Sequence, residues 1–95
     1  MLVEKTKTYL SSKKKLVKNN NELKDQIDQV EKLLEINHLD TALDFKKIIC
    51  KKDKSRKSVK IPNTQYRILL SHDEDTFVLV CVCNHNRYQI RNKNC

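Results

Sequence analysis

A seven-residue apolar repeat in the first third of the chain most constrains how this sequence can fold. Five residues spaced seven apart form it: Leu2, Tyr9, Leu16, Leu23 and Val30. Ile27 and Leu34 join them at alternate steps of three and four residues, which is the a/d spacing of a coiled coil. We therefore predict one long helix over residues 3–37 that pairs with a second copy. The expected dimer interface comprises Leu16, Asn20, Leu23, Ile27, Val30 and Leu34.

Two polar residues, Lys13 and Asn20, fall on the predicted seam. A buried amide is satisfied only opposite another polar group, so Asn20 favours a dimer over a higher oligomer, in either helix orientation. Lysines dominate before residue 19 and acidic residues dominate after it. Two interpretations stay open. The charges form a solvated face, or they meet a partner, which is nucleic acid at the Lys13–Lys15 end or a basic protein at the other end.

The apolar period changes after residue 44, where short runs rich in β-branched and aromatic residues alternate with polar breaks. The runs are Phe45–Cys50, Ser58–Ile61, Gln65–Leu70, Thr76–Cys83 and Arg87–Arg91. Short breaks favour antiparallel hairpins, because parallel strands need longer connections. We predict an α+β fold in which the long N-terminal coiled-coil helix precedes a small antiparallel β-meander of three to five strands. The expected domains are a dimerising helix (1–37), a connector (38–44) and a basic β domain (45–95).

Positive charge is concentrated in the second half of the chain. The formal net charge is +8, and residues 41–95 carry 12 Lys and Arg against 5 Asp and Glu, a net of +7. Such a density of cations favours an anionic partner, and flexible lysines contact phosphates without reading bases. The alternative is solubilising charge around an exposed loop. The predicted nucleic-acid contacts are Lys46, Lys47, Lys51, Lys52, Lys54, Arg56, Lys57, Lys60, Arg67, Arg87 and Arg91.

A Cys-x-Cys-x-His pattern, formed by Cys81, Cys83 and His85, ends the most apolar run. Zinc binds such side chains, but structural sites need four ligands, usually with two to four residues between paired ligands. Residues that could complete a site are Cys50, His72 and Cys95. The alternative is that Cys81 and Cys83 are small buried hydrophobic residues. We expect no metal and no other cofactor.

Catalytic motifs are scarce. The chain has no glycine, which removes the glycine-rich phosphate-binding loops. The contiguous Ser71, His72 and Asp73 cannot form a relay, because the three side chains must converge from separate positions. His38 lies in the connector and is expected to be a turn residue. These observations predict a protein without enzymatic activity.

The sequence therefore predicts a non-enzymatic homodimer that binds DNA or RNA. The rival hypothesis is a structural or adaptor subunit of a larger assembly, docked through the coiled coil and the doubly apolar strand 77–83. With no stretch of 18 uncharged apolar residues and no secretory signal, we expect a soluble intracellular protein without membrane contact. The abundance of Lys, Asn and Ile hints at an AT-rich genome, such as that of a virus.

Overall fold

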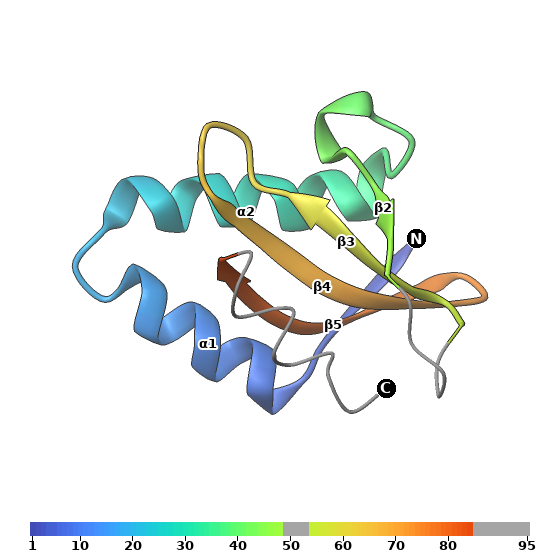
Figure 1. Cartoon of the computed structure of the whole chain (residues 1–95), viewed down its shortest axis with the longest axis horizontal. Coiled ribbons are helices and arrows are strands. Elements are labelled where there is room, and N and C mark those ends of the chain that lie inside the picture. Colours follow the sequence, from blue (N-terminus) through green and yellow to red (C-terminus); the bar gives the residue numbers. More distant parts are fainter. Residues whose placement is uncertain (49–53, 85–95) are drawn as a thin grey trace.

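The computed structural model describes residues 1–48 and 54–84, with the backbone only for Cys83. Its elements are β1 (Leu2–Lys5), α1 (Lys7–Val17), α2 (Asn21–Ile36), a 3-10 turn η1 (Thr41–Leu43), β2 (Lys46–Lys47), β3 (Arg56–Lys60), β4 (Tyr66–Asp73) and β5 (Thr76–Asn84). The strands form one sheet in the order β1-β5-β4-β3-β2. Figure 1 shows β3 and β4 passing in front of α2, with α1 beside β5. Tyr9 of α1 shares the core that α2 forms with one face of the sheet.

The α+β class is confirmed, but the predicted long coiled-coil helix is wrong. Two short helices replace it, and Asn20 caps the second one because its side chain accepts a hydrogen bond from the Leu23 N–H (3.1 Å). Asparagine favours helix starts over helix interiors, since its side chain competes for backbone hydrogen bonds. Lys18, Asn19 and Asn20 thus separate α1 from α2.

The apolar stripe of α2 packs on the chain's own sheet. Leu23, Ile27, Val30 and Leu34 are at most 4% exposed and share one core with strand residues such as Ile68. Leu16 is half-buried against the same core. A stripe with spacing of three and four residues fits a sheet as well as a second helix. These side chains are therefore buried within a single chain, and they are not exposed to form a dimer interface.

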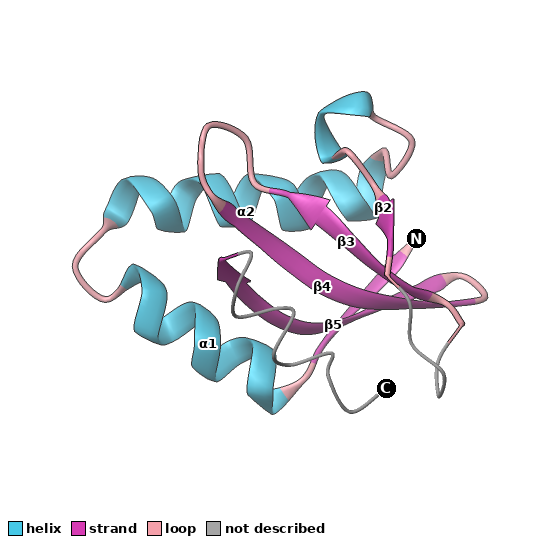
Figure 2. Ribbon diagram, viewed as in Figure 1, coloured by secondary structure: helices cyan, strands magenta, loops and turns pink. Residues whose placement is uncertain are grey.

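The predicted pure meander is also wrong, because the sheet is mixed. Strands β2 to β5 pair antiparallel in sequence order, as the hairpins predict, but β1 pairs parallel with β5, with Leu2 opposite Thr76. Figure 2 shows β1 at the edge of the sheet beside β5. The predicted strand Arg87–Arg91 lies outside the described residues.

Helix α1 covers the part of β5 that extends beyond β1. The Ser12 hydroxyl accepts a hydrogen bond from the Val82 N–H (3.0 Å), and the Thr6 hydroxyl donates one to the Leu79 carbonyl (2.9 Å). Thr6 also caps α1, where it accepts from the Tyr9 N–H (3.1 Å). An unpaired strand edge invites pairing with another chain, and these side chains satisfy it instead.

A buried polar cluster joins α1 to α2. The Tyr9 hydroxyl donates to Glu31 (2.5 Å), and the Lys13 ammonium donates to Glu31 (3.1 Å) and to Asp28 (2.5 Å). Burial first, and then the Glu31 contact, raise the pKa of Tyr9 far above its usual value, so the phenol stays neutral. Burial alone would lower the pKa of Lys13, but its hydrogen bonds to Asp28 and Glu31 raise it overall. The hydrogen bonds that Asp28 accepts from Lys13 and Lys24 lower the pKa of its carboxyl group.

Within the described residues, no helix combines the length and the apolar character that a membrane crossing requires.

Candidate functional site

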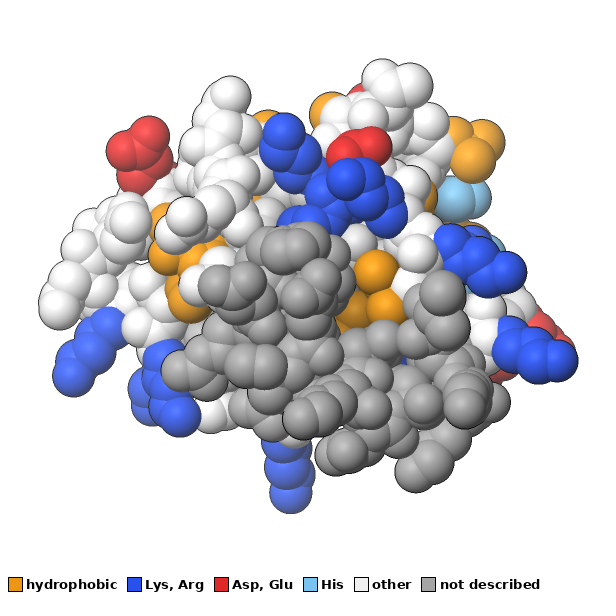
Figure 3. Space-filling view, viewed as in Figure 1, with side chains coloured by type: hydrophobic (Ala, Val, Ile, Leu, Met, Phe, Trp, Pro, Cys, Tyr) orange, Lys and Arg blue, Asp and Glu red, His pale blue; other side chains and the backbone are white. Residues whose placement is uncertain are grey.

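Cationic side chains gather on the sheet face opposite α1 and α2, which we call the outer face. Side chains alternate between the two faces of a strand, so every second residue of β3 and β4 lies there. In the register, Lys60 is opposite Arg67 and Lys46 is opposite Ser58. We define the basic patch as the outer-face residues Lys46, Arg56, Lys60 and Arg67. Figure 3 shows Lys and Arg side chains, in blue, gathered over β2 and β3.

Arg67 is the buried member of the basic patch. It is 9% exposed, its Nε donates to the Ser58 hydroxyl (2.9 Å), and its Nη2 donates to the Asp44 carbonyl (2.7 Å). The Asp44 carboxylate lies 3.5 Å from Nη1. The planar guanidinium can hold these acceptors together in a way that a lysine ammonium cannot. Arg67 therefore fixes the entry to β2 against β3 and β4.

The other members of the basic patch reach solvent. Lys46 and Lys60 are exposed, and Arg56 is half-buried with its Nε donating to the Ser71 hydroxyl (3.1 Å). Ser58 and Ser71 lie opposite Lys46 and Arg56 on the same face, so small hydroxyls separate the cations. Such a surface attracts a polyanion through its phosphates.

Of the remaining predicted nucleic-acid contacts, the three that the structure describes do not join this patch. Lys54 is exposed in the turn before β3, and Lys47 is exposed on the other side of β2. Lys57 faces the helix side, with its ammonium 6.0 Å from the centroid of the Phe45 ring and 3.5 Å from His72 Nδ1. Lys51, Lys52, Arg87 and Arg91 lie outside the described residues.

The candidate metal residues are only partly described. Cys81 is buried on the outer face beside Leu69, as expected of a small hydrophobic residue. The Cys83 side chain, His85, Cys50 and Cys95 lie outside the described residues. Among residues 1–48 and 54–84, no three His, Cys, Asp or Glu side chains are placed to hold a metal ion.

His72 lies on the helix side of β4, among aromatic rings. Its ring centroid is 4.7 Å from that of Phe77, which also contacts His38 (5.8 Å) and Phe45 (5.7 Å). His72 Nε2 is 2.9 Å from the Glu74 carbonyl oxygen. Because consecutive strand residues point to opposite faces, Ser71 and His72 diverge and form no nucleophile–base pair.

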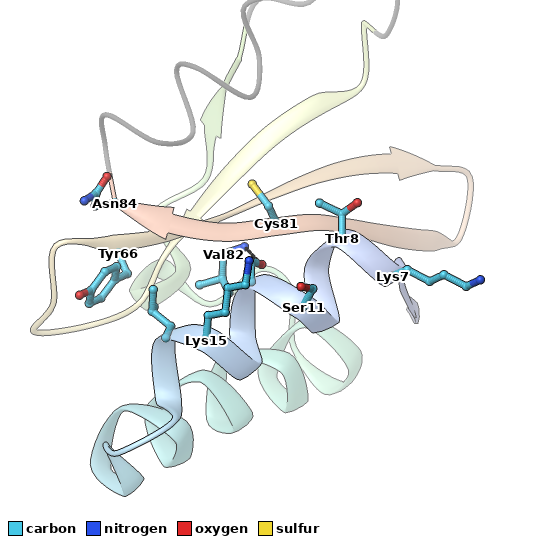
Figure 4. A pocket seen from close by; sticks show the side chains of 10 residues that line it. Lys7, Thr8, Ser11, Lys15, Tyr66, Cys81, Val82 and Asn84 are labelled. Atoms are coloured by element: carbon cyan, nitrogen blue, oxygen red, sulfur yellow. Dashed lines mark hydrogen bonds between the residues drawn. The ribbon is translucent and has the colours of Figure 1, made fainter.

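Sequence reasoning missed a groove between α1 and β5 because it assigned α1 to a coiled coil. The groove has a volume of about 570 Å³, and we call it the α1–β5 groove. Lysines and hydroxyls of α1 form one wall, and β4 and β5 form the other (Figure 4). Its lining residues are Lys7, Thr8, Ser11, Ser12, Lys15, Leu16, Tyr66, Cys81, Val82 and Asn84.

Solved structures of bacterial toxins share this fold. No protein-family model and no curated protein sequence matches the chain. The Escherichia coli DinJ–YafQ complex is similar with a TM-score of 0.73 at 10% identity, covering 90% of this chain and 93% of that one. The Staphylococcus aureus YoeB–YefM complex is similar with a TM-score of 0.68 at 17% identity, covering 90% and 98%. A copper-bound mutant toxin from Helicobacter pylori has a TM-score of 0.72 at 16% identity, covering 92% and 97%.

These similarities overturn the predicted function. The chain matches nearly the whole length of proteins titled as toxins or as parts of toxin–antitoxin complexes. The predicted non-enzymatic coiled-coil homodimer that binds nucleic acid is therefore wrong, and so is the adaptor alternative. The predicted absence of catalysis is contradicted by the same finding. The functional prediction failed because residues 3–37 were assigned to one dimerising helix, an arrangement that this fold does not contain.

Proposed function

We propose that this chain is the toxin of a toxin–antitoxin pair and that it acts by cleaving RNA. The observation that carries the proposal is the fold, which matches solved toxins over nine-tenths of the chain. Fold similarity at this level of identity does not determine an activity, so the outer face must supply the chemical argument.

The chemistry of RNA explains how a site without an obvious nucleophile can be catalytic. Each RNA phosphodiester lies beside a 2′-hydroxyl, which can lose its proton to water and attack the phosphorus. The bond from phosphorus to the 5′-oxygen of the next nucleotide then breaks, and that oxygen takes a proton from water. The protein then needs no nucleophilic Ser or Cys, whereas it does need cations where negative charge accumulates on the phosphate. Lys46 and Lys60 are exposed cations on the outer face, and Arg56, at the opposite end of β3 from Lys60, donates a hydrogen bond to Ser71.

Arg67 serves a positioning role in this proposal. Its guanidinium is buried and bonded to Ser58 and Asp44, so its side chain pays little conformational entropy on substrate binding. A preorganised cation beneath the exposed lysines strengthens the positive potential of the outer face without moving. The Asp44 side chain is half exposed, and its carboxylate offsets the positive charge only near the Nη1 atom of Arg67.

The proposed partner is an antitoxin. Two of the similar structures are complexes, DinJ–YafQ and YoeB–YefM, and the latter is titled a toxin–antitoxin heterotetramer. A chain with a net charge of +8 suits a partner segment rich in Asp and Glu, because complementary charge speeds association. We propose that the toxin acts inside the cell, where its RNA target is found.

Controlled expression in Escherichia coli tests the proposal. We expect growth arrest within one or two generations of induction, together with loss of full-length messenger RNA. The variant Lys46→Gln/Lys60→Gln should relieve the arrest. The matched control, Lys18→Gln/Lys32→Gln, removes the same charge from an exposed position after α1 and an exposed position in α2, and it should remain toxic. Normal growth and intact RNA with folded wild-type protein would overturn the proposal.

A further inference from the structure

We propose that the α1–β5 groove binds a nucleotide segment of single-stranded RNA, separately from the basic patch. This inference rests on the proposed function and adds a second contact for the same substrate. The groove volume of about 570 Å³ falls within the range of about 300–1,000 Å³ that is usual for small-ligand sites.

The charge of α1 favours an anion in the groove. The helix contains four lysines and no acidic residue. Lys13 is turned toward α2, where it binds Asp28 and Glu31. Lys7 and Lys15 are exposed and line the groove. None of the ten described lining residues is acidic, so the groove has no carboxylate to oppose a phosphate.

The groove also offers contacts for a base and a sugar. Figure 4 shows Tyr66 and Asn84 at one end, Lys7 at the other and Lys15 between them. An aromatic ring can stack on any base, and an amide can hydrogen-bond to a base edge. The α1 hydroxyls of Thr8 and Ser11 can reach a ribose or a phosphate oxygen. The Asp and Glu side chains of an acidic peptide would pair with the lysines, but they have no ring to stack on the tyrosine.

The groove and the basic patch include consecutive residues at the start of β4. Tyr66 and Arg67 are consecutive strand residues, so their side chains point to opposite faces of the sheet. Beyond Leu79, β5 has α1 rather than β1 beside it. In this proposal, one RNA molecule contacts both surfaces.

The test compares paired lysine variants of equal charge. Lys7→Gln/Lys15→Gln removes the groove cations, and Lys14→Gln/Lys18→Gln removes two exposed lysines of the same region that do not line the groove. The probe is a fluorescent ten-nucleotide 2′-O-methyl RNA, which lacks the attacking hydroxyl, and its affinity is measured by anisotropy against salt. The magnitude of the slope of log K against log salt should fall by about 1.4 in the groove variant. This value follows from two lost phosphate contacts at about 0.7 each. The control should keep the wild-type slope.

The tyrosine is tested independently of charge. Tyr66→Leu should weaken binding of the same RNA by about tenfold, within the range of base–aromatic stacking, and should leave the salt slope unchanged. Tyr66→Phe keeps the stacking ring and should bind like wild type. The lysine variants and Tyr66→Phe retain the packing around the core, so they report on binding even where Tyr66→Leu lowers stability.

Two results would overturn the inference while leaving the proposed function intact. In the first, wild type cleaves RNA, but Lys7→Gln/Lys15→Gln and Tyr66→Leu bind the probe as the controls do. In the second, the groove variant binds RNA normally but loses affinity for an acidic antitoxin peptide, which would assign the groove to the protein partner. Wild-type protein that neither binds nor cleaves RNA would overturn both proposals.

Discussion

Removing the Glu31 carboxylate should destabilise the fold more than any single exposed charge does. The Glu31 side chain is 10% exposed and accepts hydrogen bonds from the buried Tyr9 hydroxyl and from Lys13. Glu31→Leu leaves the phenol without a partner, which costs about 1–3 kcal/mol, and removes a buried ion pair. We expect a total loss of about 3–4 kcal/mol. A chain of this length has about 5–14 kcal/mol of stability, so the loss is a large fraction of it.

A double-mutant cycle separates the hydrogen bond from packing. Tyr9→Phe alone should cost about 1–2 kcal/mol, because it removes one hydrogen bond to a charged group. The double variant Tyr9→Phe/Glu31→Leu should cost less than the sum by about 1–2 kcal/mol, since no phenol is then left unpaired. Urea unfolding of all four proteins at pH 7 gives the coupling directly.

An exposed ion pair provides the matched control. Lys24 and Asp28 are 2.9 Å apart, with side chains 53% and 40% exposed. Lys24→Met should therefore change stability by at most about 0.5 kcal/mol. Strictly additive effects of Tyr9→Phe and Glu31→Leu, or a Glu31→Leu loss no larger than that of Lys24→Met, would refute the idea that this cluster holds α1 to α2.

Three further predictions concern packing, the sheet edge and pH. Ile27→Ala should cost about 2–5 kcal/mol in urea unfolding, because Ile27 is fully buried against the sheet, whereas a coiled-coil residue would make stability depend on protein concentration. Ser12→Ala leaves the Val82 N–H without its acceptor and should speed amide hydrogen exchange at Val82 relative to wild type. The pKa of Asp28 is lowered in the folded state. The Asp28 carboxylate therefore stabilises the fold above its unfolded-state pKa of about 4, and this stabilisation is lost as the pH falls below that value. Asp28→Asn should reduce the change of the urea midpoint with pH between pH 5 and about pH 3. A pH dependence equal to that of wild type would contradict this assignment.

Much of the sheet was predictable because its signals are local. The alternation and polar breaks of residues 56–84 predicted β3, β4 and β5 with their antiparallel order. Strand β1 was not predictable in this way, since its parallel partner β5 lies at the other end of the chain. Its residue Leu2 also fell on the seven-residue repeat, and the repeat was assigned to a helix.

The helical error has a specific physical origin. Spacing of three and four residues shows that α2 has an apolar stripe, but it does not identify what covers the stripe. Asn20 carried the decisive information, as a helix cap rather than as a buried amide at a dimer seam. Asparagine has both uses in proteins, and the neighbouring Asn19 and Asn21 favoured the cap.

The candidate site was partly predictable. Alternation along β3 and β4 places Arg56, Lys60 and Arg67 on one face, but it does not show that Arg67 is buried against Ser58. The proposed catalysis was not predicted, because a search for a nucleophile and a base assumes that the protein supplies the nucleophile. In RNA cleavage the substrate can supply it, so composition alone cannot exclude that activity.

Mapping RNA ends tests the central claim most directly. Purified protein is incubated with a defined messenger RNA, free and on programmed ribosomes, and the products are located by primer extension. We predict discrete cuts with wild type and with Lys18→Gln/Lys32→Gln, at least tenfold weaker cuts with Lys46→Gln/Lys60→Gln, and no cut where the 2′-hydroxyl at the site is methylated. Intact RNA under both conditions, or cleavage that persists at the methylated position, would contradict the proposed function.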